Sequence, residues 1–297
     1  MAETKSPYRN APAATPTDFP AQHQGKQPGS QRQMNPQPVT ENPAYKGGGK
    51  LEGRTAVVTG ADSGIGQAVA SAFAKEGADI AFAFLEEQED ADRTVRLVRE
   101  AGRRCVAVKC DLRQEDSAKQ VIDRAAAEFG HIDVLVNNIA VQFPQNDLGQ
   151  ITAEQLGNTF ATNVFSAFFM TKAALPHLRQ GGSIVNTASI TAYAGSPTLI
   201  DYSATKGAIV SFTRSLALSL APKGIRVNAV APGPVWTPLI PSSFDEQRVA
   251  NFGKEVPLGR ALQPFELAPA YVYLACDDSA CVSGQVLHVN GGAITES

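Results

Sequence analysis

From Leu51 onward, the chain alternates short runs of apolar and β-branched residues with longer stretches of helical patterning. This alternation is typical of βαβ units, in which parallel strands form one sheet and the connecting helices cover it. Seven runs are predicted to be strands, over residues 55–59, 80–84, 106–110, 134–137, 183–187, 226–230 and 286–289. Several lack polar alternation, as expected of strands covered on both faces. We therefore predict an α/β fold with a doubly wound, parallel, seven-stranded sheet and helices on both faces, in a single domain over residues 51–297.

Boundary signals support the predicted helices. Four glycines follow helical runs where a left-handed cap is expected: Gly77, Gly102, Gly130 and Gly224. Thr152 and Gln155 predict a capping box that opens one long helix through Phe160 and Met170.

Residues 1–50 differ in composition from the rest of the chain. They contain eight of the 19 prolines and carry a net charge of +3, which leaves −6 for the remainder. Such a segment cannot bury enough apolar surface to offset its ordering entropy. We expect this N-terminal arm to be either disordered or laid as a strap over the folded domain, of its own or of a neighbouring subunit.

The composition argues against several classes of partner. The net charge of −3 gives no electrostatic reason to expect binding to nucleic acid or to an anionic membrane. No stretch has the ~18 uninterrupted apolar residues of a spanning helix, and no apolar segment typical of a secretory signal follows Met1. Four cysteines without CxxC spacing predict free thiols and no metal site: Cys105, Cys110, Cys276 and Cys281. We expect a cytoplasmic protein with a small-molecule substrate.

A glycine-rich turn follows the first predicted strand. Residues 59–66 read TGADSGIG and lead into an amphipathic helix. Gly60 permits a tight turn, Gly64 lets the backbone approach a pyrophosphate, and Gly66 lets the helix pack closely on the strand. Phosphates would then lie at the helix N-terminus, where unpaired N–H groups favour negative charge. The turn predicts a dinucleotide site in a Rossmann-type sheet.

This glycine spacing resembles that of the short-chain dehydrogenase/reductase family, and further family motifs follow in order. The resemblance implies that cofactor contacts come from four places: Asp62, Ser63 and Ile65 in the turn, Asp111 and Leu112 after the third strand, Asn138 and Ala140 after the fourth, and Pro232, Gly233, Val235 and Thr237 beside the nicotinamide. Ile139 and Ala140 replace the family's Ala-Gly and add bulk near the cofactor ribose, which we expect to be accommodated.

The end of the second predicted strand bears on the choice between NAD and NADP. Phe84 and Leu85 supply neither the acidic side chain that binds a ribose 2′-hydroxyl nor an arginine for a 2′-phosphate. Five carboxylates follow within residues 86–92 and would repel a 2′-phosphate, unless Arg93 or an arginine from elsewhere turns in. We expect NAD, with Glu86 at the cofactor and NADP as the alternative; the acidic run also suits a solvated first turn of a helix.

Tyr202 and Lys206 are the predicted catalytic pair. Their spacing of four places both side chains on one helix face. A phenol titrates near ~10, and a neighbouring ammonium and a positive nicotinamide would both favour the phenolate. Ser189, after the fifth strand, can hydrogen-bond a substrate oxygen. The resemblance further implies that Lys206 binds the nicotinamide ribose and that Asn163 holds a water linking Lys206 to solvent.

These residues predict hydride transfer between a nicotinamide and a carbonyl or alcohol, with Tyr202 as acid and base. The arm and residues 233–244 (GPVWTPLIPSSF) are similar to the subgroup of general-stress and glucose/ribitol dehydrogenase-like proteins. This resemblance implies an aldehyde, ketone or sugar alcohol as substrate. A 3-oxoacyl thioester reductase is the alternative enzyme, and a dinucleotide-binding sensor or scaffold is the alternative outside catalysis. We expect residues 236–262 to form a substrate lid over a floor of Ile190, Tyr193, Leu199 and Ile200.

The helix that contains Asn163 carries more apolar residues than one sheet can cover. Phe165, Phe168, Phe169 and Met170 sweep most of its circumference. Self-association across a two-fold axis is the common solution. The family resemblance implies a homotetramer, with a second interface near residues 285–292 and with a dimer as the alternative. We expect deletion of the arm to weaken assembly more than cofactor binding.

Overall fold

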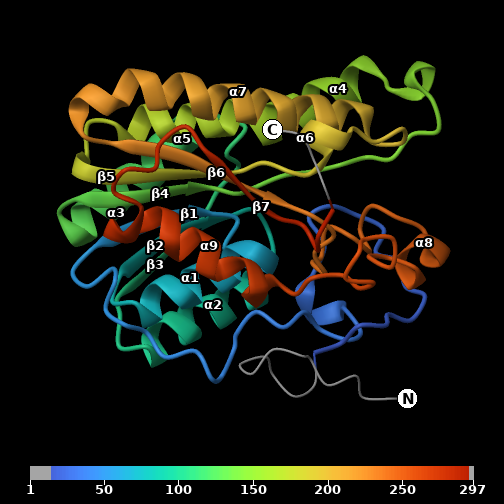
Figure 1. Ribbon diagram of the computed structural model, residues 1–297, viewed down its shortest axis with the longest axis horizontal. Coiled ribbons are helices and arrows are strands. Elements are labelled where there is room, and N and C mark those ends of the chain that lie inside the picture. The colour runs from blue at the N-terminus through green and yellow to red at the C-terminus, as the bar shows by residue number, and fades with distance from the viewer. Residues whose placement is uncertain (1–14, 294–297) are drawn as a thin grey trace.

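The computed structural model describes residues 15–293 and has one parallel sheet of seven strands. Their order across the sheet is β3-β2-β1-β4-β5-β6-β7 (Figure 1). The strands are β1 (Thr55–Thr59), β2 (Asp79–Phe84), β3 (Cys105–Lys109), β4 (Ile132–Asn137), β5 (Leu178–Thr187), β6 (Arg226–Pro232) and β7 (Val286–Val289). The order reverses between β1 and β4, which is where doubly wound sheets bind their ligands. The predicted fold class and all seven strands are confirmed.

Helices cover both faces of the sheet. One face carries α1 (Gly64–Lys75), α2 (Gln88–Glu100) and α9 (Pro264–Ala275), and the other carries α3 (Glu115–Phe129), α4 (Ala153–Phe160), α5 (Ser166–Ala174) and α7 (Ile200–Leu220) (Figure 1). Two short helices lie in connections, α6 (Thr191–Ala194) and α8 (Glu246–Ala250). Within the described residues, no helix is long and apolar enough to cross a membrane.

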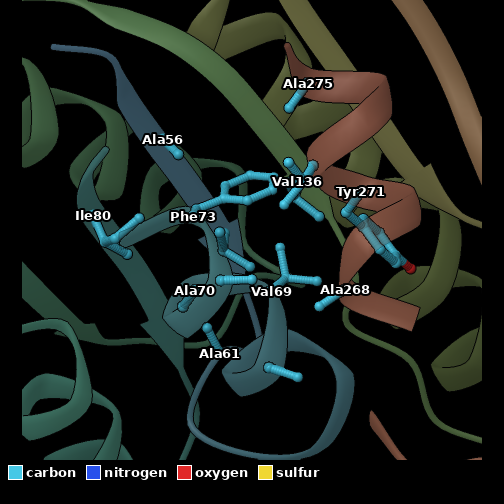
Figure 2. Packing of buried hydrophobic residues seen from close by; sticks show 14 of the residues in the cluster. Ala56, Ala61, Val69, Ala70, Phe73, Ile80, Val136, Ala268, Tyr271 and Ala275 are labelled. Atoms are coloured by element: carbon cyan, nitrogen blue, oxygen red, sulfur yellow. The ribbon is translucent and has the colours of Figure 1, made fainter. Parts of the chain in front are cut away.

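Small side chains let α1 pack closely on α9 above the sheet. Val69, Ala70 and Phe73 of α1 face Ala268 and Tyr271 of α9, and all five are buried (Figure 2). Because alanines keep the two helix axes close, the phenyl ring of Phe73 fills the space between them and the strands. This packing fixes the start of α1 at the carboxyl edge of β1.

Helix ends match the predictions at some positions and depart from them at others. Gly77, Gly102, Gly130 and Gly224 all have positive φ, from +68° to +100°, as predicted. Thr152 accepts from the Gln155 backbone, but the Gln155 side chain donates to Phe143 O and Asp201 instead of completing a capping box. The predicted single helix is divided by a π turn, η3 (Ala161–Phe165), which separates α4 from α5.

Residues 15–50 of the N-terminal arm lie against the folded domain, and residues 1–14 are outside the described part. The ring of Phe19 stacks on Trp236 with centroids 3.9 Å apart, and the Trp236 indole donates to Pro36 O at 2.9 Å. Further along, Glu41 forms an ion pair with Lys75 of α1 at 2.7 Å. The only regular element described in this segment is the 3-10 turn η1 (Gln31–Gln33). Side-chain contacts hold the segment in place, together with backbone hydrogen bonds from Gln24 N to Pro241 O and from Phe265 N to Val39 O.

Candidate active site

The glycine turn has the geometry that the sequence predicts. Gly60 and Gly64 have φ of +66° and +52°, a left-handed region that favours glycine. A Cβ on Gly66 would lie 2.1 Å from Gly60 O, so only glycine lets α1 start this close to β1. The N-terminus of α1 therefore faces a cavity at the carboxyl edge of the sheet, where backbone N–H groups attract phosphate.

A cavity of about 330 Å³ lies beside this turn. Most predicted cofactor residues line it: Gly60, Asp62, Ser63, Gly64, Ile65, Glu86, Asp111, Leu112, Asn138, Ala140 and Thr237. The others do not: Gly66, Pro232, Gly233, Val235, Tyr202 and Lys206. Gly66 and Gly233 instead pack against backbone, of Gly60 and of Asn290. The lining residues and the glycine cradle fit a dinucleotide, of which this cavity is large enough to hold a part.

Three residues of the cavity wall lie in the N-terminal arm and were not predicted: Gln27, Pro28 and Gly29. The composition of the arm gave no signal for them, because contacts between distant segments leave no local pattern. Arg93, which was considered as a partner for a 2′-phosphate, instead donates to Gln37 of the arm at 3.1 Å.

Asn138 connects the ends of three central strands. Its Nδ2 donates to Thr59 O at 3.1 Å and to Gly60 O at 3.3 Å, while its Oδ1 accepts from the Thr187 hydroxyl at 3.2 Å. The neighbouring Ile139 packs over Gly60, where an added Cβ would lie 2.7 Å from its Cγ2. The extra bulk at residue 139 is therefore accommodated because residue 60 has no side chain.

Ser189, Tyr202 and Lys206 meet at the carboxyl end of β5. Ser189 lies close enough to the Tyr202 side chain to influence its pKa, and the Lys206 ammonium donates to Thr187 O at 2.8 Å. The Lys206 nitrogen lies 5.6 Å from the centre of the Tyr202 ring. All three side chains are buried. The structure thus brings together the three residues to which the sequence analysis assigned the chemistry.

Burial sets the protonation of this group. It raises the pKa of Tyr202 to about 12, although the nearby Ser189 hydroxyl acts in the opposite direction. It also lowers the pKa of Lys206 to about 7. We expected Lys206 and a nicotinamide to favour the phenolate, but within the chain itself desolvation is the largest influence on the Tyr202 pKa and raises it. The phenol therefore keeps its proton at neutral pH and is suited to act as an acid.

Asn163 lies in the π turn, and its amide is occupied by neighbouring groups. Its Oδ1 accepts from Val141 N at 2.8 Å, and its Nδ2 donates to Val141 O at 2.9 Å and to Thr205 at 3.1 Å. The side chain thereby fixes the loop after β4 against α7. Its link to Lys206 through a water stays a prediction.

The predicted lid packs over Tyr202 together with the arm. Tyr202 and Leu199 form one apolar cluster with Phe19 and Met34 of the arm and with five buried lid residues: Trp236, Ile240, Phe244, Val249 and Ala261. Of the predicted pocket floor, only Leu199 belongs to this cluster. Tyr193 packs on the ring of His288, with centroids 4.6 Å apart, and the Ile200 side chain is exposed. The apolar character of these residues does not by itself show which of their side chains point toward Tyr202.

The four cysteines are free, as predicted. Among the described residues, no three His, Cys, Asp or Glu side chains gather in a way that could hold a metal ion.

The parallel sheet, the glycine turn and the buried Ser189–Tyr202–Lys206 group together define a dinucleotide-dependent oxidoreductase. A family model described as Enoyl-(Acyl carrier protein) reductase matches residues 60–294. Glucose and ribitol dehydrogenase of Daucus carota is 54% identical over 93% of this chain and 97% of its own length. General stress protein 39 of Bacillus subtilis is 51% identical over 93% and 97%, and the chloroplastic NADPH-dependent aldehyde reductase 1 of Arabidopsis thaliana is 48% identical over 93% and 98%.

Solved structures that resemble this chain include dehydrogenases and reductases bound to a dinucleotide. A short-chain dehydrogenase from Burkholderia cenocepacia in complex with NADP has a TM-score of 0.77 at 30% identity, and covers 82% of this chain and 98% of its own. A 3-ketoacyl-(acyl-carrier-protein) reductase from Brucella melitensis complexed with NADH has a TM-score of 0.75 at 34% identity, with the same coverage. The chain belongs to the short-chain dehydrogenase/reductase family, and the predicted likeness to general-stress and glucose/ribitol dehydrogenase proteins is confirmed.

Proposed function

We propose that this enzyme interconverts an aldehyde or ketone with the corresponding alcohol, sugar alcohols included, and that Ser189, Tyr202, Lys206 and Asn163 form its catalytic site. A bound nicotinamide cofactor supplies or accepts the hydride. The observation that carries the proposal is the shared burial of Ser189, Tyr202 and Lys206, with the Lys206 nitrogen 5.6 Å from the centre of the Tyr202 ring. The glycine turn and the cavity beside it support the binding of a dinucleotide next to this group.

Each side chain has a distinct task in this scheme. The Tyr202 phenol donates its proton to the substrate oxygen in reduction and recovers it in oxidation. The Ser189 hydroxyl orients that oxygen and stabilises the negative charge that develops on it. Lys206, held by Thr187 O, provides a nearby cation that eases proton loss from Tyr202. Asn163 positions the loop after β4 at the cavity.

The substrate class is inferred from the comparisons and the lid. The relatives at 48–54% identity are named as a glucose and ribitol dehydrogenase and an aldehyde reductase, whereas the 3-ketoacyl reductase is 34% identical. The apolar lid and the arm cover Tyr202, which favours a compact carbonyl compound over a long acyl chain. A sensor or scaffold would have no need of a buried Lys206, whose desolvation is costly.

We also propose that the chain forms a cytoplasmic homotetramer. Phe165 and Phe168 are each 49% exposed, whereas Phe169 is partly buried and Met170 is fully buried. The two exposed rings leave an apolar surface along η3 and α5 that a second copy would cover. Leu287 on β7 is also exposed and supports the second interface.

A spectrophotometric screen tests the proposed activity. The purified protein is mixed with NADPH or NADH and aldehydes, ketones or a 3-oxoacyl thioester, and with the oxidised cofactors and polyols. Oxidation of the reduced cofactor by small aldehydes or ketones, or its formation from polyols, is the expected result. Turnover of the thioester alone would favour the alternative enzyme, and cofactor binding without any turnover would favour a sensor.

A further inference from the structure

Residues 24–30 of the N-terminal arm, which we call the arm loop, form a wall of the cofactor cavity. The Gln24 side chain closes this loop, because its Nε2 donates to Ser30 O at 2.9 Å and its Oε1 accepts from Ser30 N at 2.7 Å. The Gln24 backbone also donates to Pro241 O at 2.8 Å. The tip of the loop is therefore held in place over the cavity that Gln27, Pro28 and Gly29 line.

The arm loop also reaches the opposite side of the cavity. The Gln27 side chain donates to Gln142 O at 2.6 Å and accepts from Gln142 N at 3.2 Å. Just beyond the loop, the buried Gln31 accepts from Gly64 N at 2.8 Å, within the glycine turn. Contacts to the glycine turn, to the loop after β4 and to the loop after β6 make the arm part of the dinucleotide site.

Lys26, at the tip of the arm loop, is paired with the acidic run after β2. Its Nζ lies 2.8 Å from Glu86 and 3.7 Å from Glu87, and Glu86 lines the cavity. The lysine side chain is 66% exposed, so its long stem is free to change direction. Other charges near this corner are the buried Asp62 and, at the end of β3, Lys109, whereas Arg32 of the arm pairs with Glu89 outside the cavity wall.

The end of β2 is where a Rossmann-type site meets the 2′ position of the adenosine ribose. Phe84 and Leu85 provide no group for it, and Glu86 and Glu87 would repel a 2′-phosphate. Lys26, through its pairing with the cavity-lining Glu86, brings a positive charge to this end of the cavity from the N-terminal arm. We propose that Lys26 pairs with the 2′-phosphate of NADP and thereby sets the cofactor selectivity of this enzyme. The inference rests on the proposed nicotinamide function.

Calorimetric titration of the full-length protein with NADP⁺ and with NAD⁺ tests this role. Lys26→Met should weaken NADP⁺ binding by about tenfold and change NAD⁺ binding by less than about twofold, since one charge contact with a partly exposed dianion is lost. Arg32→Met is the matched control, because it removes an equally exposed arm cation that also pairs with the acidic run. It should leave both affinities unchanged.

The same substitution in a protein that also carries Glu86→Gln shows whether Lys26 acts on the phosphate directly or only through Glu86. If Lys26 contacts the phosphate, Lys26→Met should still weaken NADP⁺ binding when Glu86 is replaced by Gln. A loss that disappears in Glu86→Gln would overturn the proposal, because Lys26 would then act only by neutralising Glu86. Equal weakening of NAD⁺ and NADP⁺ would overturn it as well, because Lys26 would then only hold the arm. Failure of the unchanged protein to bind either dinucleotide would instead refute the proposed function.

Discussion

Lys206 is almost completely buried, and its position has a cost that depends on pH. Its pKa is lowered from an ordinary 10.5 to about 7 in the folded protein. The unfolded chain therefore binds more protons between these two values, and stability must rise with pH through that interval. The cost of burying Lys206 is complete below pH 7 and disappears toward pH 10.5.

Lys206→Met should therefore stabilise the fold while it abolishes catalysis. We expect a gain on the order of a few kcal/mol at pH 7, measured by denaturant unfolding, and a smaller gain at pH 10. Lys172→Met is the control, because that exposed lysine pairs with Glu115 on the surface. A gain that does not change between pH 7 and pH 10 would show that Lys206 is not desolvated.

The spacing of Tyr202 and Lys206 predicted their shared helix face, and Ser189 was placed from the strand before it. The sequence could not predict how deeply Tyr202 is buried, since that depends on Trp236 of the lid and Phe19 of the arm. It therefore indicated a lowered tyrosine pKa, where the structure has a raised one.

At the scale of elements, the junction of β1 and α1 depends on Gly66. Because a Cβ there would lie 2.1 Å from Gly60 O, Gly66→Ala must move the helix away from the strand. We expect a loss of roughly 1–3 kcal/mol in unfolding free energy and weaker cofactor binding.

Gly157→Ala is the matched control for Gly66→Ala. Gly157 lies in α4, is exposed, and has open space where a Cβ would be placed. Alanine there should stabilise the protein by up to ~1 kcal/mol, through helix propensity alone. Equal effects of the two substitutions in unfolding experiments would contradict the close packing described for Gly66.

Runs of apolar residues predicted the strands well, because each central strand is buried on both faces and is therefore apolar at consecutive positions. Strand ends in polar stretches were harder to predict. β5 was expected to begin at residue 183 but begins at Leu178, because Leu178 pairs with Ile132 ahead of the polar stretch Arg179–Gly182. The π turn in the helix of Asn163 was missed as well. The hydrogen bonds between Asn163 and Val141 lie across the fold and leave no periodic signal.

At the scale of the whole molecule, the arm is the part that the sequence least determined. Its composition was compatible with disorder or with a strap, and only the contacts of particular side chains distinguish them. Gln31 is 1% exposed and bonds Gly64 and Gln67, while Asp90 accepts from the Gln31 backbone. These partners are buried polar groups that would lose a hydrogen bond without the arm.

Deletion of residues 1–50 should therefore weaken cofactor binding more than assembly, the reverse of what the sequence suggested. The melting temperature should fall by roughly 5 °C or more, since the lid also loses Phe19 and Met34. Light scattering should still give the same number of subunits as in the full-length assembly. Deletion of residues 1–14 alone is the control, because it leaves the contacts of residues 15–50 with the folded domain in place. A protein without residues 1–50 that dissociates but binds cofactor normally would show that the arm serves assembly instead.

Tyr202→Phe tests most directly whether this protein is an oxidoreductase that moves its proton through Tyr202. The substitution keeps the buried ring and removes only the hydroxyl, whose pKa the nearby Ser189 lowers. Turnover should be measured by the absorbance of reduced nicotinamide with the best carbonyl substrate, alongside cofactor affinity and melting temperature. We predict a fall in turnover of ~10² or more with cofactor affinity nearly unchanged. Near-normal turnover in a folded variant would contradict the assignment.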